Sequence, residues 1–233
     1  MEDRMQAGPD DLGKRAAWAT LKFMAFLAVL LFACAGTLAW WQGWLFLANF
    51  CGWSIATTLY FYRHDRALLE RRMRVGPTAE REPAQKRIQL FNVLVMMVLF
   101  VVSALDRRFG WSDVPWVAVI AGNLLIAIAF LGFFVVLRQN SFASATVQIV
   151  EGQRVISDGL YGIVRHPMYA AAFPLAVGLP LALGSWWGLV GVPLFVAGLV
   201  ARLLDEEKHL ARDLPGYAEY RSRVRYRLFP GLW

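Results

Sequence analysis

The residues best suited to chemistry lie together in one short segment, SDGLYGIVRHPMY at 157–169. Two tyrosines, an arginine and a histidine fall within its last nine residues. Pro167 fixes its own φ angle and disfavours a helical conformation at His166 before it. Because long apolar segments lie on either side, the pattern predicts a shaped polar loop at a membrane surface.

A second polar cluster, RLLDEE at 202–207, lies at the end of the last apolar segment. Arg202 and Glu206 are four residues apart, so they share one face of a helix that continues from that segment. Glu206 and Glu207 point about 100° apart on such a helix, so they cannot both serve Arg202. An arginine here is often only a snorkelling anchor. Together with the 157–169 segment, however, the cluster is expected to close over one cofactor, and a carboxylate would hold its ammonium group or ribose hydroxyls.

The composition is typical of a membrane protein. Of the 233 residues, 58% are hydrophobic and 18% are charged, which is too apolar for an ordinary soluble domain. Apolar runs recur throughout, which favours a single membrane domain, with N-terminal membrane helices in 1–137 and a catalytic, cofactor-binding region in 138–233. The three histidines are scattered and both cysteines lie in apolar runs, so no metal site is expected.

Six apolar runs are long enough to enter or cross a bilayer. They cover residues 19–38, 44–62, 88–105, 114–137, 169–183 and 186–204. The fifth run has 15 residues and two prolines, and as a helix it would reach about 22 Å into a core roughly 30 Å thick. The sequence therefore predicts an all-α integral membrane protein with about six transmembrane segments, the last two forming a short helical hairpin.

Positive charge is distributed unevenly among the segments that join these runs. With the N-terminus placed in the cytoplasm, 21 Lys and Arg residues lie in cytoplasmic segments and only Arg107 and Arg108 lie in the opposite loops. This bias predicts that both termini, the 63–87 loop and both polar clusters are cytoplasmic. It also explains the net charge of +7 without nucleic acid. The 63–87 loop and the basic tail 216–230 are expected to touch anionic lipid.

The C-terminal motifs resemble those of the isoprenylcysteine carboxyl methyltransferase family of integral membrane enzymes, which is related to the phosphatidylethanolamine N-methyltransferases. The resemblance runs from Asn140 through VISDGLYGIVRHPMY, the hydrophobic hairpin and RLLDEEKHL to GYAEYRSRV, roughly the last 95 residues. Ala171 stands where many members have glycine, so packing at the start of the hairpin is expected to differ. The resemblance implies a methyltransferase that uses S-adenosyl-L-methionine, with an amphiphilic acceptor such as a prenylcysteine carboxylate.

The resemblance also implies roles for particular residues. Glu206 would hold the cofactor, and Arg202 would be the catalytic residue facing the acceptor carboxylate beside the transferred methyl group. The other residues implied in the cofactor pocket are Gln148, Gln153, Arg154, Val155, Ile156, Tyr161, His166, Pro167, Met168 and Tyr169. Methyl transfer from a sulfonium needs alignment and exclusion of water more than a nucleophilic side chain or a metal.

Other interpretations remain open at this point. A lipid amine or a small thiol is an alternative acceptor. A membrane reductase of the sterol-reductase type, using NADPH, has a similar C-terminal region, but the sequence offers no basic group dedicated to a 2′-phosphate. A transporter or structural membrane protein is the non-enzyme alternative. It would be favoured by ionisable residues at mid-membrane depth or by inverted repeats, and the sequence has neither.

Overall fold

The computed structural model describes residues 9–73, 75–80, 82–146 and 152–233, and these residues form helices and loops with no strand. The helices are α1 (Pro9–Ala35), α2 (Trp41–His64), α3 (Arg66–Met73), α4 (Pro83–Phe109), α5 (Trp116–Gln139), α6 (Pro167–Ala182), α7 (Val192–Asp213) and α8 (Tyr217–Arg223). Three short 3-10 helices join them: η1 (Pro77–Ala79), η2 (Gly159–Gly162) and η3 (Trp187–Gly191). The all-helical prediction is confirmed for this part of the chain.

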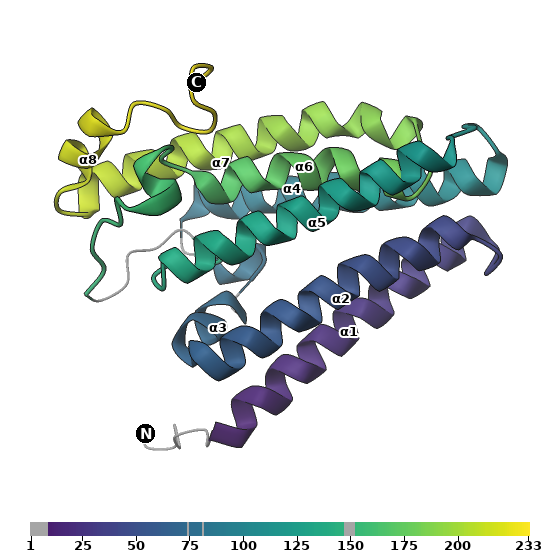
Figure 1. Cartoon of the computed structure of the whole chain (residues 1–233), viewed down its shortest axis with the longest axis horizontal. Helices are drawn as coiled ribbons and strands as arrows, with labels where there is room; N and C mark the ends of the chain where they lie inside the picture. Colours follow the sequence, from purple (N-terminus) through teal and green to yellow (C-terminus); the bar gives the residue numbers. More distant parts are fainter. Residues whose placement is uncertain (1–8, 74, 81, 147–151) are drawn as a thin grey trace.

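Helices α4 to α7 form a bundle, and α1 and α2 form a hairpin against it (Figure 1). The most extensive contact is between α5 and α6, while the hairpin meets the bundle through α4 and α5. In Figure 1 the hairpin lies close to the bundle where α1 turns into α2, and it diverges from the bundle toward α3. We call the end formed by 152–166 and 205–233 the tail end, and the end formed by 106–116 and 183–188 the turn end.

Each of the six apolar runs forms a helix, but only four of the described helices have the length and apolarity of a membrane span. They are Asp11–Ala35, Pro83–Phe109, Trp116–Gln139 and Trp187–Asp213. Helix α2 has 24 residues, as α5 has, but Asn49 and neighbouring threonines make it less apolar. Helix α6 has 16 residues and reaches about 24 Å, less than the roughly 30 Å of a bilayer core. The described residues thus contain four candidate spans, and the prediction of about six transmembrane segments stays a prediction.

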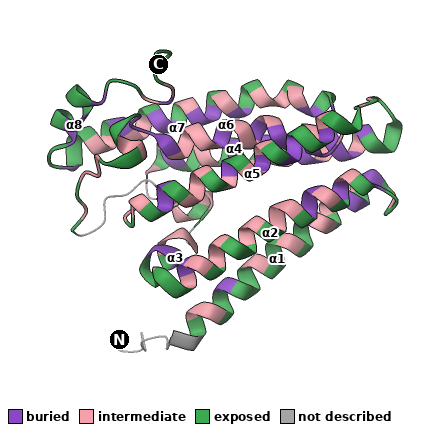
Figure 2. Ribbon diagram, in the orientation of Figure 1, coloured by how far each residue is buried: buried purple, intermediate pink, exposed green. Residues whose placement is uncertain are grey.

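The outer faces of the helices are exposed (Figure 2), and many of the exposed residues are large and apolar. Val29 of α1, Leu94 of α4, Leu124 of α5 and Leu194 of α7 are all exposed. Exposed aliphatic side chains spread over so many helices are what a lipid surrounding requires, because lipid tails are as apolar as the side chains themselves. The fold therefore suits an integral membrane protein in a lipid bilayer.

Helix α6 is fixed against α5 by close backbone packing. A Cβ atom on Gly122 would lie 2.4 Å from the backbone nitrogen of Ala182, and one on Gly178 would lie 2.7 Å from the Gly122 oxygen. Nearer the tail end, Ala171 packs against Gly132, where an added Cβ would meet its methyl group at 2.8 Å. The residue that Ala171 contacts on α5 is itself a glycine, so α5 and α6 approach closely although α6 carries an alanine here. This packing sets where the first residues of α6 reach the tail end.

Helix α7 extends to Asp213, nine residues beyond the apolar run that ends at 204. The cluster 202–207 therefore continues the helical register of the last membrane segment, as predicted. Before it, the chain turns at Gly184, whose φ of +74° is left-handed and favours glycine. The turn sends α7 back along α6, so residues at the end of α7 arrive beside those at the start of α6.

Candidate functional site

A cavity opens at the tail end, between the 152–166 loop, the start of α6 and the ends of α7 and α8. It encloses about 110 Å³, or about 580 Å³ when the space open to solvent at its mouth is counted. Its lining residues are Asn140, Gln153, Arg154, Val155, Ile156, Tyr161, Arg165, His166, Pro167, Met168, Tyr169, Glu206, Leu210, Leu214, Tyr217 and Tyr220. Aromatic and aliphatic walls with a few convergent polar groups are typical of a site for a small molecule.

Ten of the residues predicted to contact a cofactor line this one cavity. They are Gln153, Arg154, Val155, Ile156, Tyr161, His166, Pro167, Met168, Tyr169 and Glu206. The eleventh, Gln148, lies outside the described residues. The fold thus gathers a loop, the first turn of α6 and one turn of α7 at one place, while the binding role of each residue stays a prediction.

Glu206 points its carboxylate at the cavity. Its Oε2 accepts a hydrogen bond of 2.5 Å from the hydroxyl of Tyr169, which comes from the first turn of α6. Its Oε1 has no hydrogen-bond partner among the described residues. One oxygen of Glu206 is therefore held in place, and the other can accept a hydrogen bond from an ammonium or hydroxyl group of a ligand.

Glu207, the next residue, is buried and holds three segments together. Its Oε1 accepts from Arg165 Nε at 2.7 Å and lies 3.2 Å from His166 Nε2, and its Oε2 accepts from Arg227 Nε at 2.9 Å. Charge-assisted hydrogen bonds of this kind are short and strong when they are desolvated. The two adjacent glutamates therefore divide the work, as their different directions on the helix predicted: Glu206 faces the cavity and Glu207 holds the loop and the tail beside it.

The C-terminal tail is part of the protein core at this end. The backbone nitrogens of Arg165 and His166 donate to the oxygens of Tyr226 and Arg227, each at 2.9 Å. Side chains of α8 and the tail are buried as well, and the hydroxyl of Tyr220 donates to the backbone oxygen of Tyr161 at 2.7 Å. The prediction that the tail touches lipid stays a prediction, since Arg221, Arg223 and Arg225 are exposed, while the tyrosines and polar backbone groups of this segment are used inside the protein.

Arg202 is buried but does not line the cavity. Its Nη2 donates to Glu80 Oε1 at 2.6 Å and to the backbone oxygen of Ala145 at 2.9 Å, and its Nη1 donates to Gln89 Oε1 at 2.7 Å. No hydrogen bond joins it to Glu206, although both residues lie on one face of α7. The 63–87 loop was expected to meet lipid, but through Glu80 it instead packs against the C-terminal half.

The tyrosines of the cavity are neutral hydrogen-bonding groups. Burial raises the pKa of Tyr161 to about 12, although a hydrogen bond from Asn140 Nδ2 at 3.1 Å opposes the rise. Burial likewise raises the pKa of Tyr217 and of Tyr220. The hydroxyl of Tyr217 is buried and has no hydrogen-bond partner among the described residues. A buried hydroxyl without a partner is costly, and a ligand in the cavity would satisfy it.

Comparison with known proteins adds one match. A sequence model of the phospholipid methyltransferase family matches residues 117–215. The matched range contains nearly all of α5, the 152–166 loop, α6 and α7, and with them most of the cavity lining. No curated protein matches the chain. The family match supports a membrane methyltransferase, and it points to the family related to the isoprenylcysteine enzymes rather than to those enzymes themselves.

Several residues of the site were missed by sequence reasoning. Glu207 was seen only as the neighbour of Glu206, and Asn140 only as the start of the resemblance. Tyr217 and Tyr220 are three residues apart on α8, a spacing that puts two rings on one helix face and could have indicated a wall of a pocket.

Among the described residues, no group of three or more His, Cys, Asp and Glu could hold a metal ion.

Proposed function

We propose that the protein is a membrane methyltransferase that uses S-adenosyl-L-methionine and methylates an amphiphile bearing a carboxylate, such as a prenylcysteine. One observation carries the proposal. The residues that the motifs single out, 153–156, 161–169 and Glu206, surround one cavity, and that cavity lies largely within the range matched by the phospholipid methyltransferase family.

The groups around the cavity fit this cofactor. Glu206 Oε1 is a free acceptor suited to the ammonium group or the ribose hydroxyls, and the unpartnered hydroxyl of Tyr217 is a donor or acceptor for the same polar parts. The rings of Tyr161 and Tyr220 are flat, apolar surfaces for the adenine. Aromatic faces also attract a cation such as a sulfonium. The polar and aromatic groups of the cavity are thus those expected of a site that binds a charged nucleoside.

The bound cofactor supplies an activated methyl group with a neutral sulfide as leaving group. Transfer to a carboxylate oxygen of the acceptor would form the carbon–oxygen bond as the carbon–sulfur bond breaks, with the electron pair left on sulfur. No proton is released, so the protein needs no general base. Its residues have to hold the two reactants in line and keep water out.

Isothermal titration of the purified protein with S-adenosylhomocysteine, and separately with NADPH, tests the proposal. We expect binding of the first and none of the second. Glu206→Gln and His166→Ala should weaken the affinity about 10- to 150-fold, because a lost hydrogen bond to a charged group costs about 1.5–3 kcal/mol. Unchanged affinity in both folded variants would contradict the site, and binding of NADPH alone would contradict the reaction.

Arg202 is proposed to supply positive charge beside the acceptor. Its hydrogen bonds to Glu80, Gln89 and Ala145 hold the guanidinium in one position, one helical turn before Glu206. Arg202→Ala should largely abolish methyl transfer while S-adenosylhomocysteine affinity stays within a few-fold of the parent. Arg202→Lys should recover little, because a point charge cannot replace a planar fork of donors. Near-parental turnover in Arg202→Lys would instead make Arg202 a simple anchor.

A phospholipid amine is a second candidate acceptor, because the matched family is described by its phospholipid substrates. The two acceptors give different products. With tritiated methyl donor, a methyl ester releases its label as volatile methanol in alkali, whereas an N-methyl amine does not. Volatile label from a prenylcysteine supports the first proposal. Stable label on phosphatidylethanolamine would replace it with the second.

The topology is proposed from charge. The excess of Lys and Arg in the segments at the tail end supports a cytoplasmic site with both termini inside. Thr78, exposed in η1, and Trp111, exposed at the turn end, are suitable positions for single cysteines in a chain without Cys34 and Cys51. An impermeant maleimide added to intact cells should label Trp111→Cys and leave Thr78→Cys unlabelled. The reverse pattern would invert the topology.

A further inference from the structure

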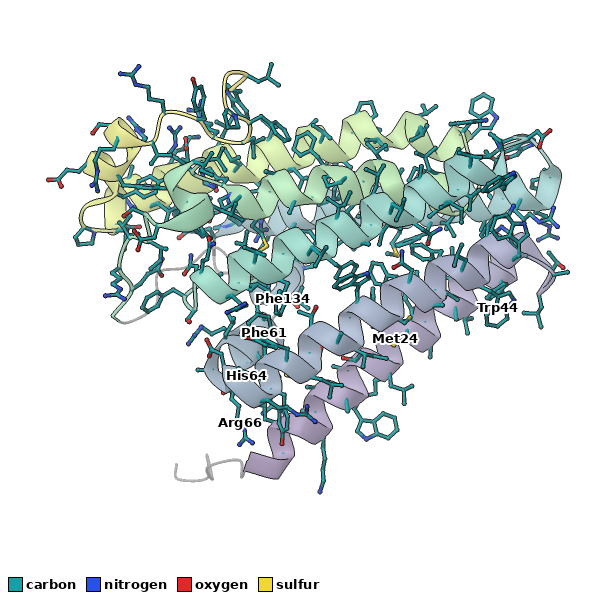
Figure 3. All side chains as sticks on the ribbon, viewed as in Figure 1. Met24, Trp44, Phe61, His64, Arg66 and Phe134 are labelled. Atoms are coloured by element: carbon teal, nitrogen blue, oxygen red, sulfur yellow. The ribbon has the colours of Figure 1, made fainter. Side chains whose placement is uncertain are left out.

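A second cavity lies between α2, α3 and α5, where the α1–α2 hairpin diverges from the bundle. We call it the groove. Its walls are mainly aromatic and aliphatic, with hydroxyls such as that of Ser54 along α2. Figure 3 shows Phe61, which lines the groove, beside Phe134 where α2 faces α5. The groove holds about 250 Å³, just below the roughly 300–1,000 Å³ of sites that enclose a whole drug-sized ligand, so it suits one apolar chain.

Arg72 of α3 is the one charged side chain among the described residues that line the groove. Its Nη1 donates to the backbone oxygen of Ser144 at 3.2 Å, and its Nε and Nη2 have no hydrogen-bond partner among the described residues. No described carboxylate makes an ion pair with it, whereas Arg202 nearby is paired with Glu80 at 2.6 Å. A charge taken out of water without a counter-ion is costly, so this guanidinium is suited to receiving an anion.

Arg72 also lies close to Arg202, because the two side chains donate to the backbone oxygens of successive residues, Ser144 and Ala145. Burial, and then the positive charge of Arg202, lower the pKa of Arg72. The charge of Arg72 acts in turn on Tyr161, which lines the cofactor cavity, and lowers the pKa of that phenol against the larger effect of burial. The guanidinium that lines the groove therefore also acts on Tyr161, a wall residue of the cofactor cavity.

We propose that the groove binds the apolar chain of the methyl acceptor and that Arg72 binds the carboxylate of that acceptor. The inference rests on the proposed function, because it names the acceptor site of the same reaction. An amphiphile matches both features: a single chain removes apolar surface from water or lipid headgroups in the groove, and a carboxylate takes the two free donors of a guanidinium. Arg202, three of whose N–H donors are held by Gln89, Glu80 and Ala145, supplies a second guanidinium beside this site.

The test measures binding of the acceptor without the cofactor. Tritiated N-acetyl-S-farnesylcysteine and its methyl ester, which has the same chain and no charge, are dialysed against the protein in detergent. The parent should bind the acid at least about tenfold more tightly than the ester, as expected for a charge-assisted contact. Arg72→Gln should abolish this preference by weakening only the acid, and Arg72→Lys should restore part of it.

Arg71→Gln is the matched control. Arg71 is the preceding residue on α3 and also donates to a backbone oxygen of the following loop, that of Ser141, but it does not line the groove. It should keep the preference for the acid. Ser54→Trp fills the groove about 10 Å along α2 from Phe61, and it should weaken acid and ester by the same factor.

The outcomes separate the inference from the proposed function. Equal loss of acid binding in Arg71→Gln and Arg72→Gln would reduce Arg72 to a clamp on the loop and overturn the inference. Displacement of the acid by phosphatidylethanolamine to the same extent in the parent and in Arg72→Gln would also overturn the inference. It would indicate that a two-chain lipid occupies the acceptor site without using Arg72. S-adenosylhomocysteine binding, measured in every variant, reports on the proposed function alone: if the parent fails to bind it, the function fails whatever the acceptor result.

Discussion

A carboxylate is buried at each end of the bundle, Glu207 at the tail end and Asp106 at the turn end, and the two are held in opposite ways. At the tail end, Glu207 is surrounded by charge, with Arg165 at 2.7 Å and Arg227 at 2.9 Å. At the turn end, Asp106 Oδ2 accepts from the hydroxyls of Ser112 at 2.6 Å and Ser185 at 2.5 Å. Both sets of contacts join segments that are apart in the sequence, but those of the tail end are charged and those of the turn end come from neutral hydroxyls. The tail end is thus held by ion pairs, and the turn end by hydroxyl hydrogen bonds to α4.

Packing differs between the ends in the same sense. Near the turn end, α5 and α6 touch backbone to backbone at Gly122 and Gly178, where there is no room for a side chain. At the tail end, the same bundle leaves a cavity and the groove. Close packing of small residues fixes the helices at one end, so the cavities at the other can be held open by polar contacts. The small-residue contacts near the turn end therefore hold the helices together, and the cavities at the tail end are the candidate places for a ligand.

The largest expected effect comes from removing the carboxylate at the tail end. Glu207→Ala leaves two guanidinium groups without their counter-ion, and breaking a buried ion pair in this way typically costs about 3–5 kcal/mol. Thermal unfolding in detergent should show the loss. S-adenosylhomocysteine binding should be lost as well, because the loop that carries His166 is no longer tied to α7.

Lys208→Ala is the control for Glu207→Ala, since Lys208 is the next residue on α7 and is exposed. It should leave both unfolding and binding unchanged. If Glu207→Ala unfolds at the parental temperature, the buried ion pairs do not stabilise the tail end. The contrast between ionic contacts at one end and hydroxyl contacts at the other would then fail.

The next effect concerns the frame. Gly122→Ala places a methyl group 2.4 Å from a backbone nitrogen of α6, which cannot move aside as a flexible side chain could. Overpacking of this kind costs about 1–3 kcal/mol. Gly52→Ala in α2 is the control, because an added Cβ there meets nothing within 4 Å. We expect lower thermal stability only in Gly122→Ala, with cofactor affinity per folded molecule unchanged. Weaker affinity at unchanged stability would instead tie the frame to the site.

The sequence predicted the helices and most of the cavity for a physical reason. Apolar runs form helices wherever lipid or core surrounds them, and the 15-residue run at 169–183 became α6 with 16 residues. Ten of the sixteen residues that line the cavity fall within 153–169, so local motifs reveal these ten. The last apolar segment was predicted to continue as a helix through Glu206. Helix α7 does so, because no proline or glycine lies between Gly198 and Asp213.

The remaining contacts depend on tertiary folding. Arg202 pairs with Glu80, which is 122 residues away, and this pairing exists only because α3 and η1 fold back against α7. No spacing rule connects such residues. The same holds for Arg227 and Glu207, where a basic tail typical of a lipid-binding segment proves to neutralise a buried carboxylate. Charge pattern alone does not distinguish the headgroup of a lipid from a glutamate of the same chain.

A smaller effect is expected from the hydroxyls of the turn end. Ser112→Ala removes one hydrogen bond to Asp106 and one from the backbone nitrogen of Trp186. Ser112 is only partly buried, so water can replace part of what is lost, and we expect a cost of about 0.5–1.5 kcal/mol. Thermal unfolding measures it. A loss as large as that of Glu207→Ala would contradict the distinction between hydroxyl contacts at the turn end and ion pairs at the tail end.

The smallest effect is expected from a second ion pair on α7, and it tests whether burial or distance decides. Arg212 and Asp213 are joined at 2.7 Å, the same distance as Arg165 and Glu207, but their side chains are 67% and 41% exposed rather than 5% each. Water and salt screen exposed charges, and holding two long side chains together costs conformational entropy. Arg212→Ala should therefore leave thermal unfolding and S-adenosylhomocysteine binding unchanged within error, at low and at high salt. A clear loss of stability at low salt that disappears at high salt would show that the pair contributes despite its exposure. In that case the thermal stability of the tail end would depend on the number of its ion pairs and not on the burial of Glu207.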